Sequence, residues 1–145
     1  MDAALCSEIT DHLAAKYKDQ KLDAIAGIES RGFFFGFLLA NKMGLPFIPI
    51  RKAGKLPFKT VSIDYALEYG TAKIEMNIDA VTAGMNVLIH DDLLATGGTA
   101  RAAASLIECQ GGNVAGFCFI TTLEFLKGRD ILAKHSSNIY EILKF

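Results

Sequence analysis

The 145-residue sequence lacks the features that direct a chain to a membrane or a nucleic acid. Its longest apolar run, residues 33–40, is far too short to span a bilayer, and nothing at its N-terminus resembles a signal peptide. Its formal net charge of −1 provides no general attraction for nucleic acid or anionic lipid. We therefore expect a cytoplasmic protein with neither a nucleic-acid nor a membrane partner.

Cysteine is also scarce, and its pattern excludes a disulfide framework. The three cysteines, Cys6, Cys109 and Cys118, are odd in number, sit in apolar patterns and lack metal-ligand spacing, which predicts reduced, buried thiols. Neither a Walker P-loop nor a G-x-G-x-x-G dinucleotide fingerprint is present. Without repeats or linkers, residues 1–145 are expected to form one domain that buries about 68% of its unfolded surface.

Helical and strand patterns alternate along the chain. Helices are predicted over 3–18, 33–43, 100–110 and 127–134, and strands over 22–28, 45–50, 87–89, 114–121 and 139–143. This alternation predicts an α/β fold with a mainly parallel sheet of about five strands flanked by helices. Residues 61–65 and 72–76 alternate in polarity, which predicts a hairpin that protrudes from the core, with a flexible loop over 51–70.

The stretch Val87–Thr99 combines a strand, an acidic pair, a glycine loop and a helix start. At the end of a strand, the Asp91–Asp92 pair suits sugar hydroxyls or a hydrated cation, because carboxylates accept hydrogen bonds. Gly97–Gly98 lets the backbone approach a ligand, and its N–H groups with the hydroxyls of Thr96 and Thr99 attract an anion. A lone Gly-Gly would favour an ordinary turn. Together the acids and threonines favour a site for a phosphorylated sugar.

The same stretch resembles the phosphoribosyl-pyrophosphate (PRPP) motif of the type I phosphoribosyltransferases, in the Asp-Asp-Leu-Leu-Ala-Thr-Gly-Gly-Thr form of the adenine members. Arg51-Lys-x-Gly-Lys-Leu-Pro57 and Leu67-Glu-Tyr-Gly70 also resemble motifs of that adenine branch. The resemblance covers nearly the whole chain. It implies the type I phosphoribosyltransferase fold, a homodimer, and transfer of the phosphoribosyl group of PRPP to adenine, giving AMP and pyrophosphate in purine salvage.

The resemblance also implies a role for each motif. The 5′-phosphate would bind at Ala95, Thr96, Gly97, Gly98 and Thr99, the ribose at Asp91 and Asp92, and pyrophosphate at Ser30, Arg31, Gly32, Arg51 and Lys55. Glu68 would move the purine proton, and Tyr69 and Leu123 would cover the base. In the family, the loop that matches residues 30–32 often contains a non-proline cis peptide. Mg²⁺ would be held mainly by PRPP, with no direct protein ligand.

Each motif also has a plainer interpretation. Ser30-Arg31-Gly32 could be only a turn, the cations of residues 51–55 a solvated loop, and Glu68 an exposed acid at a hairpin tip. However, a diphosphate in a chain with no surplus of positive charge needs such cations nearby. A positioned carboxylate also suits a purine nitrogen that must lose its proton. We therefore favour the functional interpretation.

Several features depart from the family pattern or leave alternatives open. His90 stands where the family usually has an aliphatic residue, and we expect it to point away from Asp91 as a core or interface histidine. Thr122 replaces an acid that is common in bacterial members, and Phe33–Phe37 is expected to supply core and dimer contacts. The family's N-terminal hood over the base has no counterpart here, so the chain is either a fragment or a short form. A transferase for another base (xanthine, hypoxanthine or orotate) and a non-catalytic PRPP-binding regulator remain alternatives.

Overall fold

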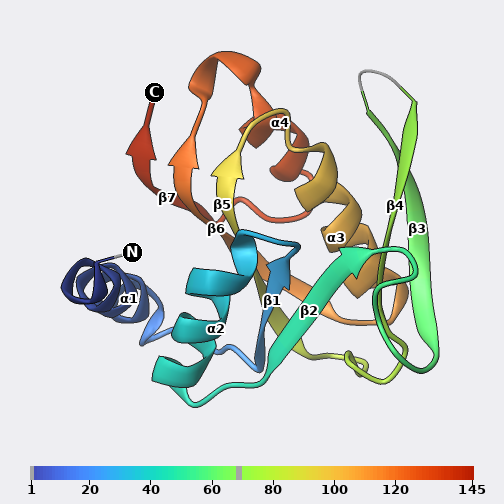
Figure 1. The fold of residues 1–145 in the computed structure, drawn as a ribbon, viewed down its shortest axis with the longest axis horizontal. Coiled ribbons are helices and arrows are strands. Elements are labelled where there is room, and N and C mark those ends of the chain that lie inside the picture. The colour runs from blue at the N-terminus through green and yellow to red at the C-terminus, as the bar shows by residue number, and fades with distance from the viewer. Residues whose placement is uncertain (1, 68–69) are drawn as a thin grey trace.

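The computed structural model describes residues 2–67 and 70–145, which form one sheet with helices on both faces (Figure 1). The strands are β1 (Ala24–Ile28), β2 (Phe47–Lys52), β3 (Thr60–Ala66), β4 (Thr71–Asn77), β5 (Asn86–Leu94), β6 (Asn113–Thr122) and β7 (Ile139–Lys144). The α-helices are α1 (Ala3–Tyr17), α2 (Gly32–Met43), α3 (Gly98–Cys109) and α4 (Gly128–Leu132), and a 3₁₀ turn, η1, covers Glu124–Leu126. The alternation read from the sequence is thus confirmed.

The sheet is larger than the sequence predicts. Strands β2, β1, β5, β6 and β7 lie side by side in that order and are all parallel, which accounts for the predicted five. The hairpin then extends the same sheet, because β4 pairs antiparallel with the end of β2 at Arg51↔Glu75 and Lys52↔Ile74. Within the described ranges the order is therefore β3-β4-β2-β1-β5-β6-β7.

Two hydrophobic cores lie on opposite faces of the parallel strands. Figure 1 shows α1 and α2 on one side of the sheet and α3 and α4 on the other. Neighbouring residues of β5 divide between them: Leu88 packs in the core under α1 and α2, and Val87 and Ile89 pack under α3. This two-sided burial explains why the central strands read as continuous apolar runs.

The hairpin is part of the core, and the prediction that it protrudes is wrong for its base. Ile74 and Met76 are buried with the α3 core, and Val61 and Ile63 pack against it. Glu75 lies between the two buried residues of β4 and is itself only 5% exposed. Polarity alternation predicts an exposed side chain here, because it shows neither the pairing of β4 with β2 nor the loop N–H groups that bind Glu75.

The face of α2 that meets the sheet is made of small residues. Gly32, Gly36 and Ala40 are buried with Leu39, and the helix ends at Gly44 in a left-handed conformation with φ of 66°, as the sequence predicts. The phenylalanines of Phe33–Phe37 are only partly buried or exposed, so they contribute less core than expected.

The cysteine prediction is confirmed in part. All three thiols are free, but Cys109 is exposed at the end of α3, whereas Cys118 is buried and Cys6 is intermediate. None of the helices in the described ranges has the length and apolar character that a bilayer crossing needs.

Candidate active site

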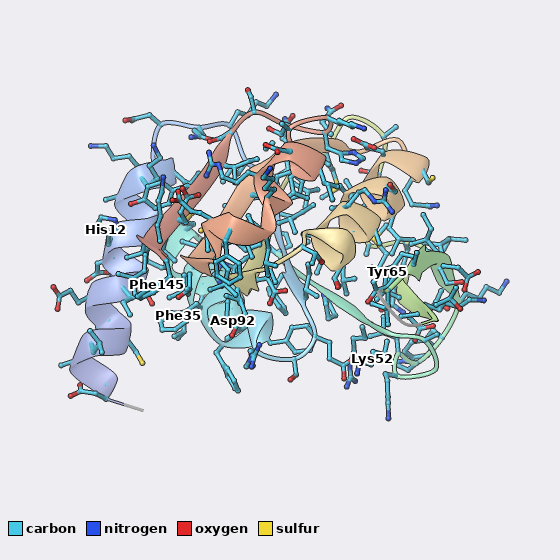
Figure 2. The ribbon with its side chains drawn as sticks, turned by 90° about the horizontal axis from the view of Figure 1, so that it is seen from above. His12, Phe35, Lys52, Tyr65, Asp92 and Phe145 are labelled. Carbon is cyan, nitrogen blue, oxygen red and sulfur yellow. The ribbon has the colours of Figure 1, made fainter. Side chains whose placement is uncertain are left out.

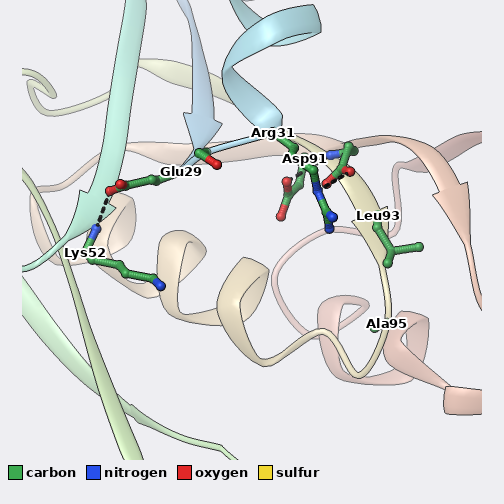
Figure 3. A pocket seen from close by; sticks show the side chains of 8 residues that line it. Glu29, Arg31, Lys52, Asp91, Leu93 and Ala95 are labelled. Atoms are coloured by element: carbon green, nitrogen blue, oxygen red, sulfur yellow. Dashed lines mark hydrogen bonds and ion pairs between the residues drawn. The ribbon is translucent and has the colours of Figure 1, made fainter.

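A cavity of about 430 Å³ opens where β1 and β5 end. It is lined by Glu29, Ser30, Arg31, Lys52, Asp91, Asp92, Leu93 and Ala95. Figure 3 shows Glu29 and Lys52 on one side of the cavity and Arg31 with Asp91 on the other. Figure 2 shows Asp92 in the middle of the molecule, with Lys52 and Tyr65 toward one end and His12 toward the other. The carboxyl edge of a parallel sheet is the usual place for a ligand.

The acidic pair lies within β5, not after it. The strand continues through Asp91 and Asp92 to Leu94, because its ladder with β6 includes Asp91↔Phe119 and Leu93↔Thr121. A predicted strand that ends at Ile89 is therefore too short. Extended backbone holds the two carboxylates at fixed positions beside the cavity.

The two carboxylates differ in their surroundings. Burial raises the pKa of Asp91, and the neighbouring negative charge of Asp92 acts in the same direction. Asp92 instead forms an ion pair with Arg31, whose Nε lies 2.7 Å from Asp92 Oδ2. The backbone N–H of Asp92 also donates to Asp91 Oδ1 at 2.9 Å. One acid is thus balanced by a guanidinium, and the other takes up a proton more readily than an ordinary aspartate.

The Ser30–Gly32 loop reaches the acidic pair through a close backbone contact. The peptide bond between Glu29 and Ser30 is cis, in agreement with the family resemblance. A Cβ on Gly32 would lie 2.9 Å from both Asp91 Oδ1 and the His90 carbonyl oxygen, so only glycine fits at this point. This loop therefore abuts β5, and Arg31 meets Asp92 as a result.

The basic loop contributes two cations near the cavity: Arg51, which was expected, and Lys52 in place of the expected Lys55. Arg51 donates from Nε and from the Nη2 atom to the Glu29 carboxylate, both at 3.2 Å, and lines a neighbouring cavity of about 140 Å³. Lys52 lines the main cavity, and its backbone N–H donates to Glu29 at 2.9 Å. The predicted Lys55 lines neither cavity, and its backbone N–H donates to Glu75 Oε1 at 3.0 Å.

Of the two glycines of the loop, Gly97 has the positive φ that glycine permits and Gly98 does not. Gly97 has φ of 81° and precedes α3, whose first residue is Gly98. The residues from Asp91 to Ala100, except Asp92, line a narrow cavity of about 80 Å³ beside this loop. Thr99 is not the helix N-cap that its type would favour; its hydroxyl donates to the Tyr65 hydroxyl at 3.3 Å. The loop also borders a further cavity of about 770 Å³, which Arg101 lines as well.

Leu123, the predicted base-covering residue that the structure describes, does not line these cavities. Leu123 follows β6, and its backbone N–H donates to the Leu94 carbonyl at 2.9 Å, which ties the segment after β6 to the end of β5. Glu68 and Tyr69 lie outside the described residues.

Comparison with known proteins accounts for this combination of loops. The family model for the phosphoribosyl transferase domain matches residues 3–140. The chain belongs to the phosphoribosyltransferase family. Its curated relatives include an adenine phosphoribosyltransferase of Cytophaga hutchinsonii, 46% identical over 99% of this chain and 80% of the relative.

Solved structures agree with the family assignment. The chain is similar to the adenine phosphoribosyltransferase of Thermoanaerobacter pseudethanolicus, with a TM-score of 0.94 and 46% identity over 99% of this chain and 83% of that one. It is also similar to the Saccharomyces cerevisiae adenine phosphoribosyltransferase, solved with an imino-altritol bisphosphate and adenine. That match has a TM-score of 0.89 and 40% identity, and it covers 98% of this chain and 81% of the yeast chain.

Two departures of this phosphoribosyltransferase from the family pattern lie inside the fold. His90 is fully buried on the face of β5 toward α2, opposite to Asp91, which confirms the predicted orientation. Neither of its ring nitrogens has a hydrogen-bond partner among the described residues. The Thr122 hydroxyl is likewise buried and unpaired within that part of the chain. Neither His90 nor Thr122 lines the cavities described above.

The sequence patterns assign no role to Glu29, Lys52 or Tyr65, all of which line the cavities. Burial alone would favour protonation of Glu29, but hydrogen bonds from Arg51 and Lys52 lower its pKa, so it remains a charged organiser of the basic loop. Glu29 stands directly before the Ser30–Gly32 loop, and this adjacency was its one sequence signal. No such signal marked Tyr65, which meets Thr99 only because the hairpin folds over α3.

Proposed function

We propose that this chain is an adenine phosphoribosyltransferase that transfers the phosphoribosyl group of PRPP to adenine in a cytoplasmic purine-salvage step. The products are AMP and pyrophosphate. One observation carries the proposal: Ser30 and Arg31, the Asp91–Asp92 pair and Ala95 line a single cavity in a chain that shares 46% identity with a curated adenine phosphoribosyltransferase.

In the proposed reaction, the C1′–oxygen bond to the diphosphate breaks and a bond from C1′ to N9 of adenine forms. Positive charge develops on the ribose ring as the diphosphate leaves. Asp91 and Asp92 would accept hydrogen bonds from the ribose hydroxyls beside that charge. The backbone N–H groups of Ala95–Thr99 would hold the 5′-phosphate at the start of α3.

Two of the cations proposed for the leaving diphosphate form ion pairs with acids in the structure. Arg31 pairs with Asp92 and Arg51 pairs with Glu29, while Lys52 faces the cavity. We propose that Arg31, Arg51 and Lys52, with Lys55 and the Ser30–Gly32 backbone, bind pyrophosphate, and that PRPP displaces at least the Arg31–Asp92 pair. This exchange would free Asp92 for the ribose at the same step.

Magnesium fits this site as part of the substrate. The described residues contain no group of three or more acidic, histidine or cysteine side chains that could enclose a metal ion. The Asp91–Asp92 carboxylates do offer oxygen donors at the cavity, and Mg²⁺ commonly binds through one or two carboxylates plus substrate phosphates and water. Once bound, the ion would neutralise charge on the departing diphosphate.

Glu68 is the proposed acceptor of the N9 proton. A positioned base contributes about 10²–10⁴-fold to a rate, so Glu68→Gln is expected to lower kcat by about 10²-fold or more with little change in the KM for PRPP. Steady-state AMP formation measures both parameters. Asp64→Asn, an exposed acid on the same hairpin, is the matched control and should behave as the wild-type chain. An unchanged kcat for Glu68→Gln would show that another group accepts the proton.

We also propose that two copies associate through the exposed face of α2. Phe34 and Phe37 are 55% and 58% exposed, and Leu38 is 37% exposed beside them. Three large apolar side chains on one helix face support a protein contact, because isolated exposed apolar residues are common but contiguous ones are not.

A base-selection assay tests the choice of adenine. The purified chain is given PRPP, Mg²⁺ and an equimolar mixture of adenine, hypoxanthine, xanthine and orotate, and the nucleotides formed are separated and identified. We expect AMP as the main product. A product derived only from an oxopurine or from orotate would assign a different base. PRPP binding without turnover of any base would instead favour a non-catalytic PRPP-binding regulator.

A further inference from the structure

The glycine loop that we assign to the 5′-phosphate packs against a second glycine far along the chain. A Cβ on Gly97 would lie 2.8 Å from the carbonyl oxygen of Gly128, the first residue of α4. The reverse contact is closer still. A Cβ on Gly128 would overlap the Ala95 carbonyl oxygen and lie 3.1 Å from the Gly97 nitrogen. The two backbones are therefore in direct contact, and the loop has no freedom to move toward α4.

Position 128 requires glycine because its neighbours leave no room for a side chain, and not because of its backbone conformation. Gly97 has a positive φ and would favour glycine in any surroundings, but Gly128 is not among the positive-φ glycines of the described residues. Its backbone suits any residue type, and it is buried. The neighbours that exclude a side chain are the Ala95 carbonyl, the Gly97 nitrogen and the Leu94 side chain, whose Cδ1 would lie 2.9 Å from the added Cβ.

The other side of Gly128 is anchored to the sheet. Arg129 forms an ion pair with Glu141 of β7, whose side chain is only 4% exposed, and also donates to the Ile139 carbonyl at 3.3 Å. Leu132, at the end of α4, is fully buried in the α3 core. Because α4 is held at both ends, Gly128 presents a fixed backbone surface to the loop.

We propose that Gly128 is a positioning residue: its backbone is the wall that holds Ala95–Gly97 in the conformation that binds the 5′-phosphate. The inference rests on the proposed function, since it assigns the glycine loop to that phosphate. Oriented N–H groups bind an anion well only when the surrounding structure fixes them, and small displacements lose much of the interaction. Any side chain at position 128 displaces the loop and weakens binding of the 5′-phosphate, while the pyrophosphate side of the cavity stays intact.

Gly128→Ala tests the proposal, with Gly116→Ala as a matched control. Gly116 is also too crowded for a side chain, since its added Cβ would lie 2.6 Å from Asn138 Nδ2 and 2.7 Å from the Asn138 carbonyl oxygen. Neither Gly116 nor Asn138 lines any of the cavities described above. Dissociation constants are measured by calorimetry for ribose 5-phosphate, a probe of the glycine loop, and for pyrophosphate, a probe of the opposite side. Thermal unfolding of both variants reports the loss of stability.

For Gly128→Ala we expect ribose 5-phosphate to bind about 10-fold more weakly or worse, with pyrophosphate binding within about 2-fold of wild type. The KM for PRPP should rise in parallel, with little change in the KM for adenine. Gly116→Ala should lower the unfolding temperature without changing either dissociation constant. Equal loss of both ligands in Gly128→Ala, or no loss of either, would overturn the proposal.

If Gly128→Ala does not fold, Arg129→Gln provides the second test. It removes the ion pair to Glu141 and loosens α4 without adding bulk, and we expect ribose 5-phosphate binding alone to weaken. Unchanged binding in that variant would equally contradict the positioning role. A wild-type chain that neither binds ribose 5-phosphate nor forms AMP would instead refute the proposed function, so the two failures are distinct.

Discussion

At the scale of single residues, the least expected side chain is His90. Its position after an apolar strand and before Asp91 predicts burial on the face opposite to the site, and that prediction is confirmed. The reason it fits was not visible in the sequence. A Cβ on Gly36 of α2 would lie 3.3 Å from His90 Cδ2, so the helix approaches closely only because a glycine faces the ring. The two residues are far apart in the chain, and no local pattern links them.

His90 is expected to make the stability of the chain depend on pH. Burial lowers its pKa from about 6.5 to about 4, because the charged ring would be cut off from water. Below about pH 6.5 the unfolded chain binds a proton at His90, whereas the folded chain binds one only near pH 4. Stability is therefore fully present above that pH and falls by about 3 kcal/mol as the pH decreases through 4.

His90→Val should abolish this contribution. Urea unfolding between pH 4 and pH 8 gives the free energy of unfolding for each chain. We expect the free energy of unfolding of the variant to rise relative to that of the wild type as the pH falls from 6.5 to 4. Above pH 7 the two values should differ little. Ile89→Val, a buried change on the same strand without a titrating group, should differ from wild type by the same amount at every pH. Parallel curves for His90→Val and wild type would mean that the histidine is hydrated.

At the scale of elements, the sequence pattern predicts the strands of the hairpin but not their place in the sheet. The alternation of polar and apolar residues correctly predicts its two strands, because every second side chain of each strand packs toward the core. It could not predict that β4 continues the sheet, since that depends on pairing with β2 across a loop. The result is the burial of Glu75, which accepts hydrogen bonds from the backbone N–H groups of Lys55 and Leu56, both at 3.0 Å. Burial alone would raise the pKa of Glu75, but these bonds lower it.

Glu75 is therefore expected to hold the basic loop against the sheet. Glu75→Gln keeps the shape but replaces a charged acceptor that serves two N–H groups and the Thr60 hydroxyl. We expect a loss of about 1–3 kcal/mol in the free energy of unfolding, measured with urea. Asp64→Asn, on the exposed face of the same hairpin, should change stability little. Equal stabilities for the two variants would contradict the anchoring role.

At the scale of the whole molecule, the sequence predicted the order of elements and the residues that meet at one edge of the sheet. Both follow from local patterns combined with the rule that parallel strands end at the same edge. The pairing of cations with acids was not predictable. Arg31 meets Asp92, and Arg51 meets Glu29, only because loops after different strands converge. Lys52 lines the cavity and Lys55 does not, and this difference also depends on how the loops fold together.

The exposed apolar face of α2 predicts a dimer. Light scattering after size-exclusion chromatography should give twice the 15.7 kDa mass of one chain. Phe34→Glu places a charge on that face and is expected to give a monomer, because a buried unpaired charge costs more than the contact gains. Phe58→Glu, at a side chain 94% exposed on a loop outside α2, is the matched control and should remain dimeric. A dimer that survives Phe34→Glu would place the interface elsewhere.

The most direct test of the central claim is the stoichiometry of the reaction. The purified chain is incubated with adenine, PRPP and Mg²⁺, and AMP and pyrophosphate are quantified in the same samples over time. We expect both products to appear in equal amounts, and neither to form when adenine or PRPP is omitted. Pyrophosphate released without AMP, or no product with intact folded protein, would contradict the claim that this site joins adenine to the ribose of PRPP.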